Sequence, residues 1–204
     1  MTPEQLFAFA NFAFVSSVTP GPNNVLLTAV GGSVGIRKGM PVLWGIVFGF
    51  ATMLFLLGLG VGKTLFSIPY VMQGMQVAGF AVLLWLSWKI ATAPVGTPEK
   101  PAGTPDHGGR GSFVGAALFQ WMNPKAWLIA AVAISVYMNT ETPVLTQAAT
   151  FSGVFIGAAI LGCLPWLAFG AIVGRYLRDP RIARSFNIVM ALLLIGSMVL
   201  VILE

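Results

Sequence analysis

The stretch FVGAALFQWMNPKAWLIAAVAISVYM, residues 113–138, carries a single charged side chain, Lys125, in an otherwise apolar segment. The segment is long enough to cross a bilayer, which takes about 20 apolar residues. Lys125 lies about 12 residues from either end, which is roughly 18 Å at the helical rise. Its side chain cannot extend that far to the membrane surface, so its ammonium must contact a cavity, a partner group or a ligand.

The composition of the whole chain is that of a membrane protein. Its 204 residues are 57% hydrophobic and 8% charged, with a mean hydropathy of +0.87. A soluble domain carries about 25% charged residues, so a soluble protein is excluded. The net charge of +5 does not indicate nucleic-acid binding, because no basic stripe is interleaved with aromatic residues. The N-terminus lacks the positive start of a cleavable signal, so we expect the first helix to be retained.

Six apolar segments predict an all-α, polytopic membrane protein with six transmembrane helices. They are residues 6–30, 40–62, 65–91, 113–138, 148–173 and 185–203. Residues 93–111 are rich in Pro and Gly and predict a flexible linker. His107 lies there and is expected to be a solvated loop histidine, so neither a metal site nor a cofactor is predicted. The chain 1–204 should form one transmembrane domain, with repeat one at about 1–92 and repeat two at about 112–204.

Basic residues predict how the six segments are oriented. Nine of the 11 Lys and Arg residues follow the first, third or fifth segment, whereas Lys63 lies on the opposite side and Lys125 lies within the membrane. The nine are Arg37, Lys38, Lys89, Lys100, Arg110, Arg175, Arg178, Arg181 and Arg184. Because cytoplasmic loops carry an excess of Lys and Arg, both termini should face outward.

An internal repeat is indicated by two helix breakers at similar depth. The sequence TPGPNN at residues 19–24 interrupts the first segment, as Asn123-Pro124 interrupts the fourth. Three segments per half is an odd number, so the second half should be inverted relative to the first, with helices 1 and 4 broken near the bilayer midplane. The glycine pairs Gly45/Gly49 and Gly153/Gly157 occupy the second and fifth segments and permit close packing, within the chain or in a homodimer.

Prolines at the two breaks should leave backbone carbonyls without their helical partners. Pro20, Pro22 and Pro124 each remove an N–H and free the carbonyl four residues back. In lipid these groups must be satisfied by protein, water or a ligand. The freed carbonyls should be those of Ser16, Val18 and Gln120.

Each break also begins a new half-helix. Gly21-Pro22 and Asn123-Pro124 are both typical of an N-cap residue followed by proline at the first helical position. The unpaired N–H groups and the positive end of the helix dipole make such a terminus suited to an anion.

The charge of Lys125 suggests what the site could bind. The sequence places all six acidic residues in loops or at the termini, at Glu4, Glu99, Asp106, Glu141, Asp179 and Glu204. A substrate carboxylate could therefore neutralise Lys125, while freed carbonyls with two asparagines could hold an ammonium. The predicted site suits an amino-acid zwitterion and comprises Thr19, Pro20, Gly21, Pro22, Asn23, Asn24, Gln120, Asn123, Pro124 and Lys125.

Three other interpretations remain open at this point. The prolines could be packing kinks, with Lys125 deprotonated by desolvation or bound to water. Ser16 or Ser17 could be activated by Lys125 in a membrane-embedded Ser–Lys hydrolase, with a half-helix N-terminus as the oxyanion hole. The chain could also be a channel or an assembly subunit without transport activity.

These motifs resemble those of the LysE/RhtB family of bacterial amino-acid exporters. That family carries Pro-Gly-Pro in its first helix and Asn-Pro-Lys in its fourth, here Pro20-Gly21-Pro22 and Asn123-Pro124-Lys125. Residues 19–24 and 85–92 are most similar to the cysteine/O-acetylserine exporter branch. The resemblance implies a multi-pass inner-membrane efflux carrier, not an enzyme, driven by the proton gradient. Its substrates would be cysteine, O-acetylserine or a threonine/homoserine-like amino acid, its other contacts would be membrane lipid, and its termini would be periplasmic.

Overall fold

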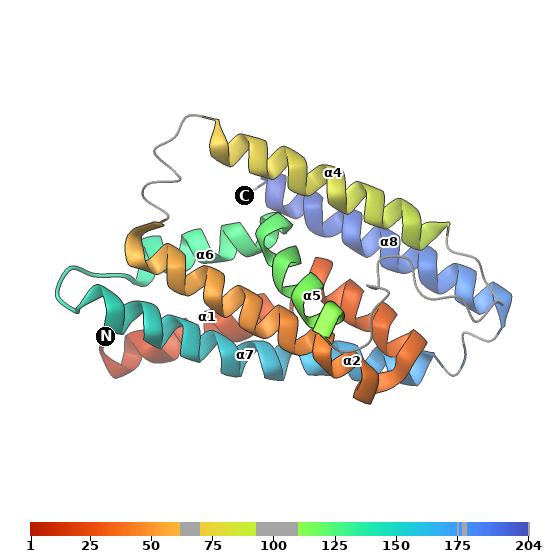
Figure 1. The fold of residues 1–204 in the computed structure, drawn as a ribbon, viewed down its shortest axis with the longest axis horizontal. Helices are drawn as coiled ribbons and strands as arrows, with labels where there is room; N and C mark the ends of the chain where they lie inside the picture. Colours follow the sequence, from red (N-terminus) through yellow and green to blue (C-terminus); the bar gives the residue numbers. More distant parts are fainter. Residues whose placement is uncertain (62–69, 93–109, 175, 177–178, 204) are drawn as a thin grey trace.

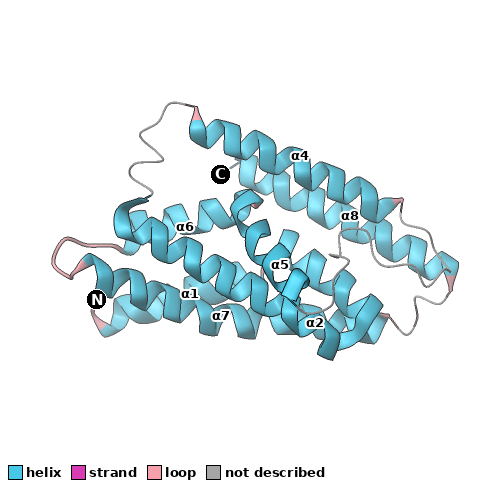
Figure 2. Ribbon diagram, viewed as in Figure 1, coloured by secondary structure: helices cyan, strands magenta, loops and turns pink. Residues whose placement is uncertain are grey.

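The computed structural model describes residues 1–61, 70–92, 110–174, 176 and 179–203, and these ranges contain helices and no strand (Figures 1 and 2). The prediction of an all-α protein is therefore confirmed. In chain order the helices are α1 (Pro3–Val18), α2 (Pro22–Leu56), the short π-helix η1 (Leu57–Val61), α4 (Val71–Ala91), α5 (Arg110–Met122), α6 (Pro124–Tyr137), α7 (Val144–Val173) and α8 (Pro180–Leu203).

Several of these helices are apolar enough for a membrane. Among the described residues, Pro22–Gly60 and Val144–Val173 are long enough to cross a bilayer, with mean hydropathies of 2.3 and 2.1. Phe113–Met122 and Pro124–Tyr137 are shorter apolar helices that follow one another directly. These features are consistent with a polytopic membrane protein, whereas six spans and an inverted repeat remain predictions.

The first two predicted spans are connected by a bend within α2 and not by a loop. Residues 31–39 are helical except at Gly35, whose φ of 76° lies in the left-handed region that favours glycine. Before this bend α2 runs parallel to α7, because Thr28 lies beside Gly170 and Gly32 beside Gly174. After the bend it runs antiparallel, with the Ala51 carbonyl bonded to Ser152. The chain therefore reverses its direction within α2, as Figure 1 shows.

The predicted linker is only partly described. Residues 93–109, which include His107, lie outside the described residues. Helix α5 already begins at Arg110, so the predicted end of the linker at residue 111 was slightly late. The apolar helix that follows extends backward into the last residues of the linker.

Close helix packing occurs at one of the two glycine pairs. A Cβ at Gly45 would collide with the backbone of Phe113, and one at Gly49 would lie 2.5 Å from Cα of Ala117. This pair therefore lets α2 pack directly against α5, as predicted. A Cβ at Gly153 or Gly157 of α7 would meet no described atom within 4 Å, so among the described residues this pair packs against no other helix.

An aromatic cluster holds α1 in place beside the breaks. Phe9 is fully buried, and its ring centroid lies 4.4 Å from that of Phe151 and 5.0 Å from that of Tyr137. Phe155 joins the same cluster, with its ring centroid 5.6 Å from that of Phe9. Offset and edge-on aromatic contacts of this kind stabilise packing beyond the burial of apolar area. They fix the first half-helix against α6 and α7.

Candidate functional site

The first helix is interrupted at residues 19–21, which we call the first break. Helix α1 ends at Val18, and α2 begins at Pro22 with Gly21 as its N-cap. Gly21 has an extended backbone, with φ of −178°, and no side chain caps this N-terminus. The interruption and the N-cap are both where the sequence predicted them.

The fourth predicted segment is interrupted at Asn123, which we call the second break. Helix α5 ends at the residue before it and α6 begins at Pro124. The Asn123 side chain caps α6, since its Oδ1 accepts a hydrogen bond of 3.1 Å from the N–H of Lys125. The N–H of Asn123 donates in turn to the Gln120 carbonyl at 3.2 Å. The predicted N-cap is confirmed, and the carbonyl freed by Pro124 is satisfied by the break itself.

Carbonyls at the first break are held by side chains. Asn24, which is only 3% exposed, donates from Nδ2 to the carbonyls of Ser17 at 3.1 Å, Val18 at 3.4 Å and Thr19 at 2.8 Å. The indole Nε1 of Trp166 in α7 donates to the Val18 carbonyl at 3.1 Å. The C-terminal turn of α1 is therefore satisfied by two side chains from α2 and α7, as a buried polar backbone requires.

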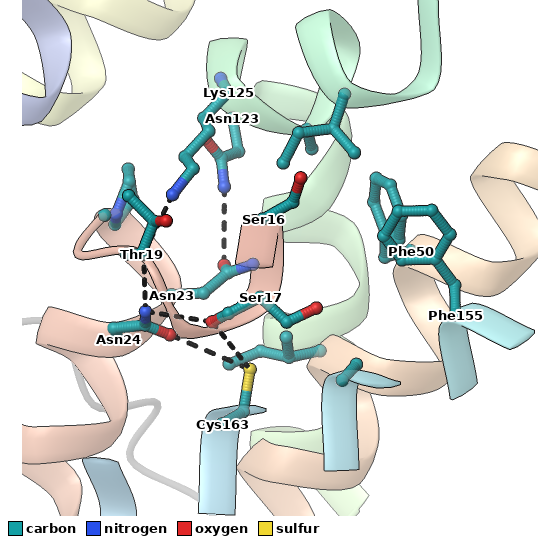
Figure 3. Close-up of a pocket in the computed structure, with 16 residues that line it drawn as sticks. Ser16, Ser17, Thr19, Asn23, Asn24, Phe50, Asn123, Lys125, Phe155 and Cys163 are labelled. Carbon is teal, nitrogen blue, oxygen red and sulfur yellow. Dashed lines mark hydrogen bonds between the residues drawn. The ribbon is translucent and has the colours of Figure 1, made fainter. Parts of the chain in front are cut away.

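Lys125 connects the two breaks. Its Nζ donates to the carbonyl oxygens of Thr19 at 2.8 Å and Pro20 at 3.3 Å. Figure 3 shows the lysine reaching from α6 toward Thr19 at the first break. The sequence required a cavity, a partner or a ligand for this ammonium, and the backbone of the first break supplies partners.

A cluster of amide side chains also joins the breaks. Asn23 and Gln120 exchange two hydrogen bonds, from Asn23 Nδ2 to Gln120 Oε1 at 2.9 Å and from Gln120 Nε2 to Asn23 Oδ1 at 3.0 Å. Asn123 Nδ2 donates to the same Asn23 oxygen at 3.4 Å. Gln120 is fully buried, so this pairing satisfies polar groups that would otherwise be costly in the interior.

A cavity lies between the two breaks (Figure 3). The space open to the centres of water molecules inside it is about 40 Å³. Of the predicted site residues, Thr19, Gly21, Pro22, Asn23, Asn24, Asn123 and Lys125 line it, whereas Pro20, Gln120 and Pro124 do not. The remaining lining residues are Ser16, Ser17, Ile46, Phe50, Ala126, Ile129, Phe155, Ala159 and Cys163.

Four residues of α7 at the site were missed by the sequence analysis, namely Phe155, Ala159, Cys163 and Trp166. Cys163 is buried and lines the cavity, with Sγ 3.7 Å from Asn24 Oδ1. Trp166 donates to the first break, and it directly follows Pro165, another proline inside an apolar segment. That proline was the available signal. An apolar segment gives no comparable signal for a lone cysteine, which usually behaves as a small hydrophobe.

The geometry also bears on the hydrolase interpretation. Ser17 Oγ donates to the Ala13 carbonyl of its own helix at 2.7 Å. Lys125 Nζ donates to the Thr19 and Pro20 carbonyls. A Ser–Lys dyad needs a hydrogen bond between hydroxyl and amine. Ser17 Oγ and Lys125 Nζ instead each donate to backbone carbonyls.

An apolar, all-helical chain with two broken helices around one polar cavity has the architecture of a membrane transporter. A family model described as LysE type translocator matches residues 14–204, and the chain belongs to this family. It is 33% identical over 199 residues to cysteine/O-acetylserine efflux proteins of Escherichia coli strain K12 and Shigella sonnei strain Ss046, with 96% of each chain covered. The protein of the same description from Escherichia coli O139:H28 has the same identity and coverage. No solved structure matches the chain.

These comparisons confirm the resemblance to LysE/RhtB exporters. The relatives are efflux transporters, so the protein is a transporter and not an enzyme, and the hydrolase interpretation is wrong. LysE-type transporters are inner-membrane proteins, and the apolar helices of this chain are compatible with that location.

Proposed function

We propose that the protein is a secondary active exporter of small amino acids or their derivatives, from cytoplasm to periplasm. The candidate substrates are cysteine, O-acetylserine and threonine- or homoserine-like amino acids. The relatives named for cysteine/O-acetylserine efflux, which match over 96% of the chain, support this substrate class. The observation that carries the proposal is one cavity lined by both helix breaks and by Lys125.

The substrate zwitterion would bind across the two breaks. Its carboxylate would lie near the Lys125 ammonium and the N-terminus of α2, where Gly21 leaves the first N–H groups without a side-chain cap. Its ammonium would lie near the carbonyls of the first break. Phe50 and Phe155, whose ring centroids are 4.9 Å apart, form an apolar wall suited to a small side chain. Hydrogen bonding at both ends with limited room between them favours small amino acids over large ones.

We propose further that the chain crosses the membrane six times with both termini in the periplasm. The reversal at Gly35 supports separate first and second spans. In Figure 1 the N-terminus lies at the left-hand end, and α8 begins at the right-hand end and runs toward the left. A periplasm-active reporter should be active after Glu204 and silent within residues 93–111. The opposite pattern would contradict this orientation.

Helix pairing supports the inverted repeat, the division into repeats at about 1–92 and 112–204, and a single domain. Helix α1 runs parallel to α7, with Ser17 beside Gly162 and Phe9 beside Phe151. Helix α5 runs parallel to the second part of α2, with Phe113 beside Gly45. An inverted two-fold relation would exchange these two pairs. The open Gly153/Gly157 face supports a homodimer as the assembly to test.

Counterflow in proteoliposomes tests the proposed transport. Vesicles containing the full chain and preloaded with unlabelled amino acid should take up labelled substrate transiently above its equilibrium level. We would compare O-acetylserine, cysteine under reducing conditions, serine, threonine and homoserine. Saturable counterflow for at least one of them is expected. Flux that rises linearly with concentration would favour a channel, and no flux for any of them would contradict the exporter.

A further inference from the structure

The ammonium of Lys125 occupies a position built from two backbone carbonyls. Its Nζ lies 2.8 Å from the Thr19 oxygen and 3.3 Å from the Pro20 oxygen, at the C-terminal side of α1. The C-terminal end of a helix carries partial negative charge on its unpaired carbonyls. Unwound carbonyls of this kind coordinate cations in broken transmembrane helices. The Lys125 ammonium therefore occupies the place that a bound cation could take at these carbonyls.

The Lys125 side chain lines the cavity beside the carbonyls and takes up part of its space. The water-centre volume of the cavity, about 40 Å³, has room for about three water molecules at roughly 10–15 Å³ each. Lys125 has a long, flexible side chain, and its departure would enlarge the cavity next to the carbonyls. Displacement of the lysine would thus give a substrate more room beside the Thr19 and Pro20 carbonyls.

Gly21 provides the space that this lysine uses. A Cβ at Gly21 would lie 2.9 Å from Cδ and 3.1 Å from Nζ of Lys125, closer than ordinary contact. The backbone there is extended, with φ of −178°, a conformation that any residue adopts. Glycine is therefore needed for room and not for backbone conformation. The first break is shaped to receive the lysine.

We propose that the Thr19 and Pro20 carbonyls form a binding site for a primary ammonium, that Lys125 fills it in the empty carrier, and that the substrate ammonium displaces Lys125 toward the substrate carboxylate. The substrate part of this proposal rests on the proposed function. One ammonium replaces another, so the Pro20 carbonyl keeps a donor in both the empty and the loaded state, and Asn24 also donates to the Thr19 carbonyl. Unpaired polar groups at this depth would be costly, so the exchange keeps both states stable in the membrane.

The ammonium site can be tested without transport. Lys125→Ala removes three carbons and the amine, which are the atoms of propylammonium. In the detergent-solubilised full chain, propylammonium should raise the Tm of this variant saturably and leave the Tm of wild type unchanged, because binding to the folded state alone stabilises it. Tetramethylammonium has no N–H donor and should have no effect. Lys38→Ala, which removes an exposed lysine, should behave as wild type.

A second variant keeps the lysine and moves it. Gly21→Ala should displace Lys125 from the carbonyls and raise its acylation by an amine-reactive reagent several-fold, measured by peptide mass spectrometry. Gly196→Ala, where a Cβ meets no described atom within 4 Å, should leave that labelling unchanged. The proposal is overturned if propylammonium stabilises Lys125→Ala no more than wild type, or if Gly21→Ala leaves labelling unchanged. If wild type shows counterflow and either of these results is negative, the proposed export function is retained. Only the proposed displacement of Lys125 is then rejected.

Discussion

The two helix breaks meet at one cavity but are stabilised in different ways. The second break is a single residue, Asn123, which caps α6 with its side chain and bonds Gln120 with its N–H. The first break spans three residues, and its carbonyls depend on groups distant in the sequence, namely Trp166 and Lys125, as well as on Asn24 nearby. The second break is capped by a local hydrogen bond, whereas the carbonyls of the first break also need donors from α6 and α7.

This difference suggests separate roles in transport. Local hydrogen bonds move with their own backbone, so the second break should keep its geometry while helices shift. Contacts between distant elements change when those elements move, as in other proteins with two discrete arrangements. We therefore expect the second break to keep its backbone geometry during transport. The first break should change when substrate binds.

The largest expected effect comes from Lys125, which serves the two breaks through different atoms. Its backbone N–H binds the Asn123 side chain, whereas its Nζ binds the first break. Lys125→Met keeps the backbone bond to Asn123 and removes the Nζ bond to the first break. The second break should therefore persist, while counterflow should fall by at least about 100-fold. Hydrogen bonds to charged groups contribute about 1.5–3 kcal/mol each, which is enough for such a loss. The protein should still insert, since a mid-membrane lysine costs about 3 kcal/mol on insertion scales.

Lys125→Arg is the matched control for charge. It keeps the positive charge but replaces a compact ammonium with a planar fork, so weak residual counterflow is expected. Counterflow at the wild-type rate in the Met variant would show that the charge is dispensable, and the distinction between the breaks would lose its central residue.

A smaller effect should separate the two asparagines that support the breaks. Asn24→Leu keeps a similar volume but removes the donor shared by three carbonyls of the first break. At about 1 kcal/mol for each net hydrogen bond, the free energy of unfolding should fall by about 2–3 kcal/mol. Asn123→Ala removes an N-cap, for which the cost is about 1 kcal/mol. Denaturant titration in mixed micelles measures both, and an equal or reversed order would contradict the comparison.

The sequence was sufficient where the structure follows local rules. Pro22 and Pro124 predicted where two helices begin, because proline fixes φ and lacks the N–H that a helix interior requires. The residues before them, Gly21 and Asn123, were predicted as N-caps for the same local reason. Lys125 stood out because a charge at that depth needs a partner.

The sequence was insufficient where distant segments meet. Gly45/Gly49 and Gly153/Gly157 have the same spacing, yet only the first pair packs against a helix of this chain in the described residues. The glycine spacing permits another helix to pack closely, but the tertiary fold determines whether a helix lies there. Trp166 was missed because its function depends on α7 lying beside Val18, and the neighbouring Pro165 does not indicate which segment α7 contacts.

The smallest and most discriminating effect concerns two tryptophans that make equivalent hydrogen bonds. Trp166 Nε1 donates to Val18 at the first break at 3.1 Å, and Trp127 Nε1 donates to Trp121 at the second at 2.9 Å. Substituting each by Phe keeps most of the ring and should lower stability by about 1 kcal/mol in both variants. Transport should nevertheless separate them, which counterflow rates at matched protein density would measure.

Trp166→Phe should slow counterflow several-fold, because it loosens α7 from the break that responds to substrate. Trp127→Phe should leave counterflow near the wild-type rate, because the second break keeps its cap between Asn123 and the Lys125 N–H. Stability serves as the internal control, since equal destabilisation removes general loss of fold as the cause of any difference. If both variants slow counterflow alike, the two breaks are equally sensitive to their partners. The contrast between a fixed break and a responsive one would then have to be abandoned, even with Lys125 still essential.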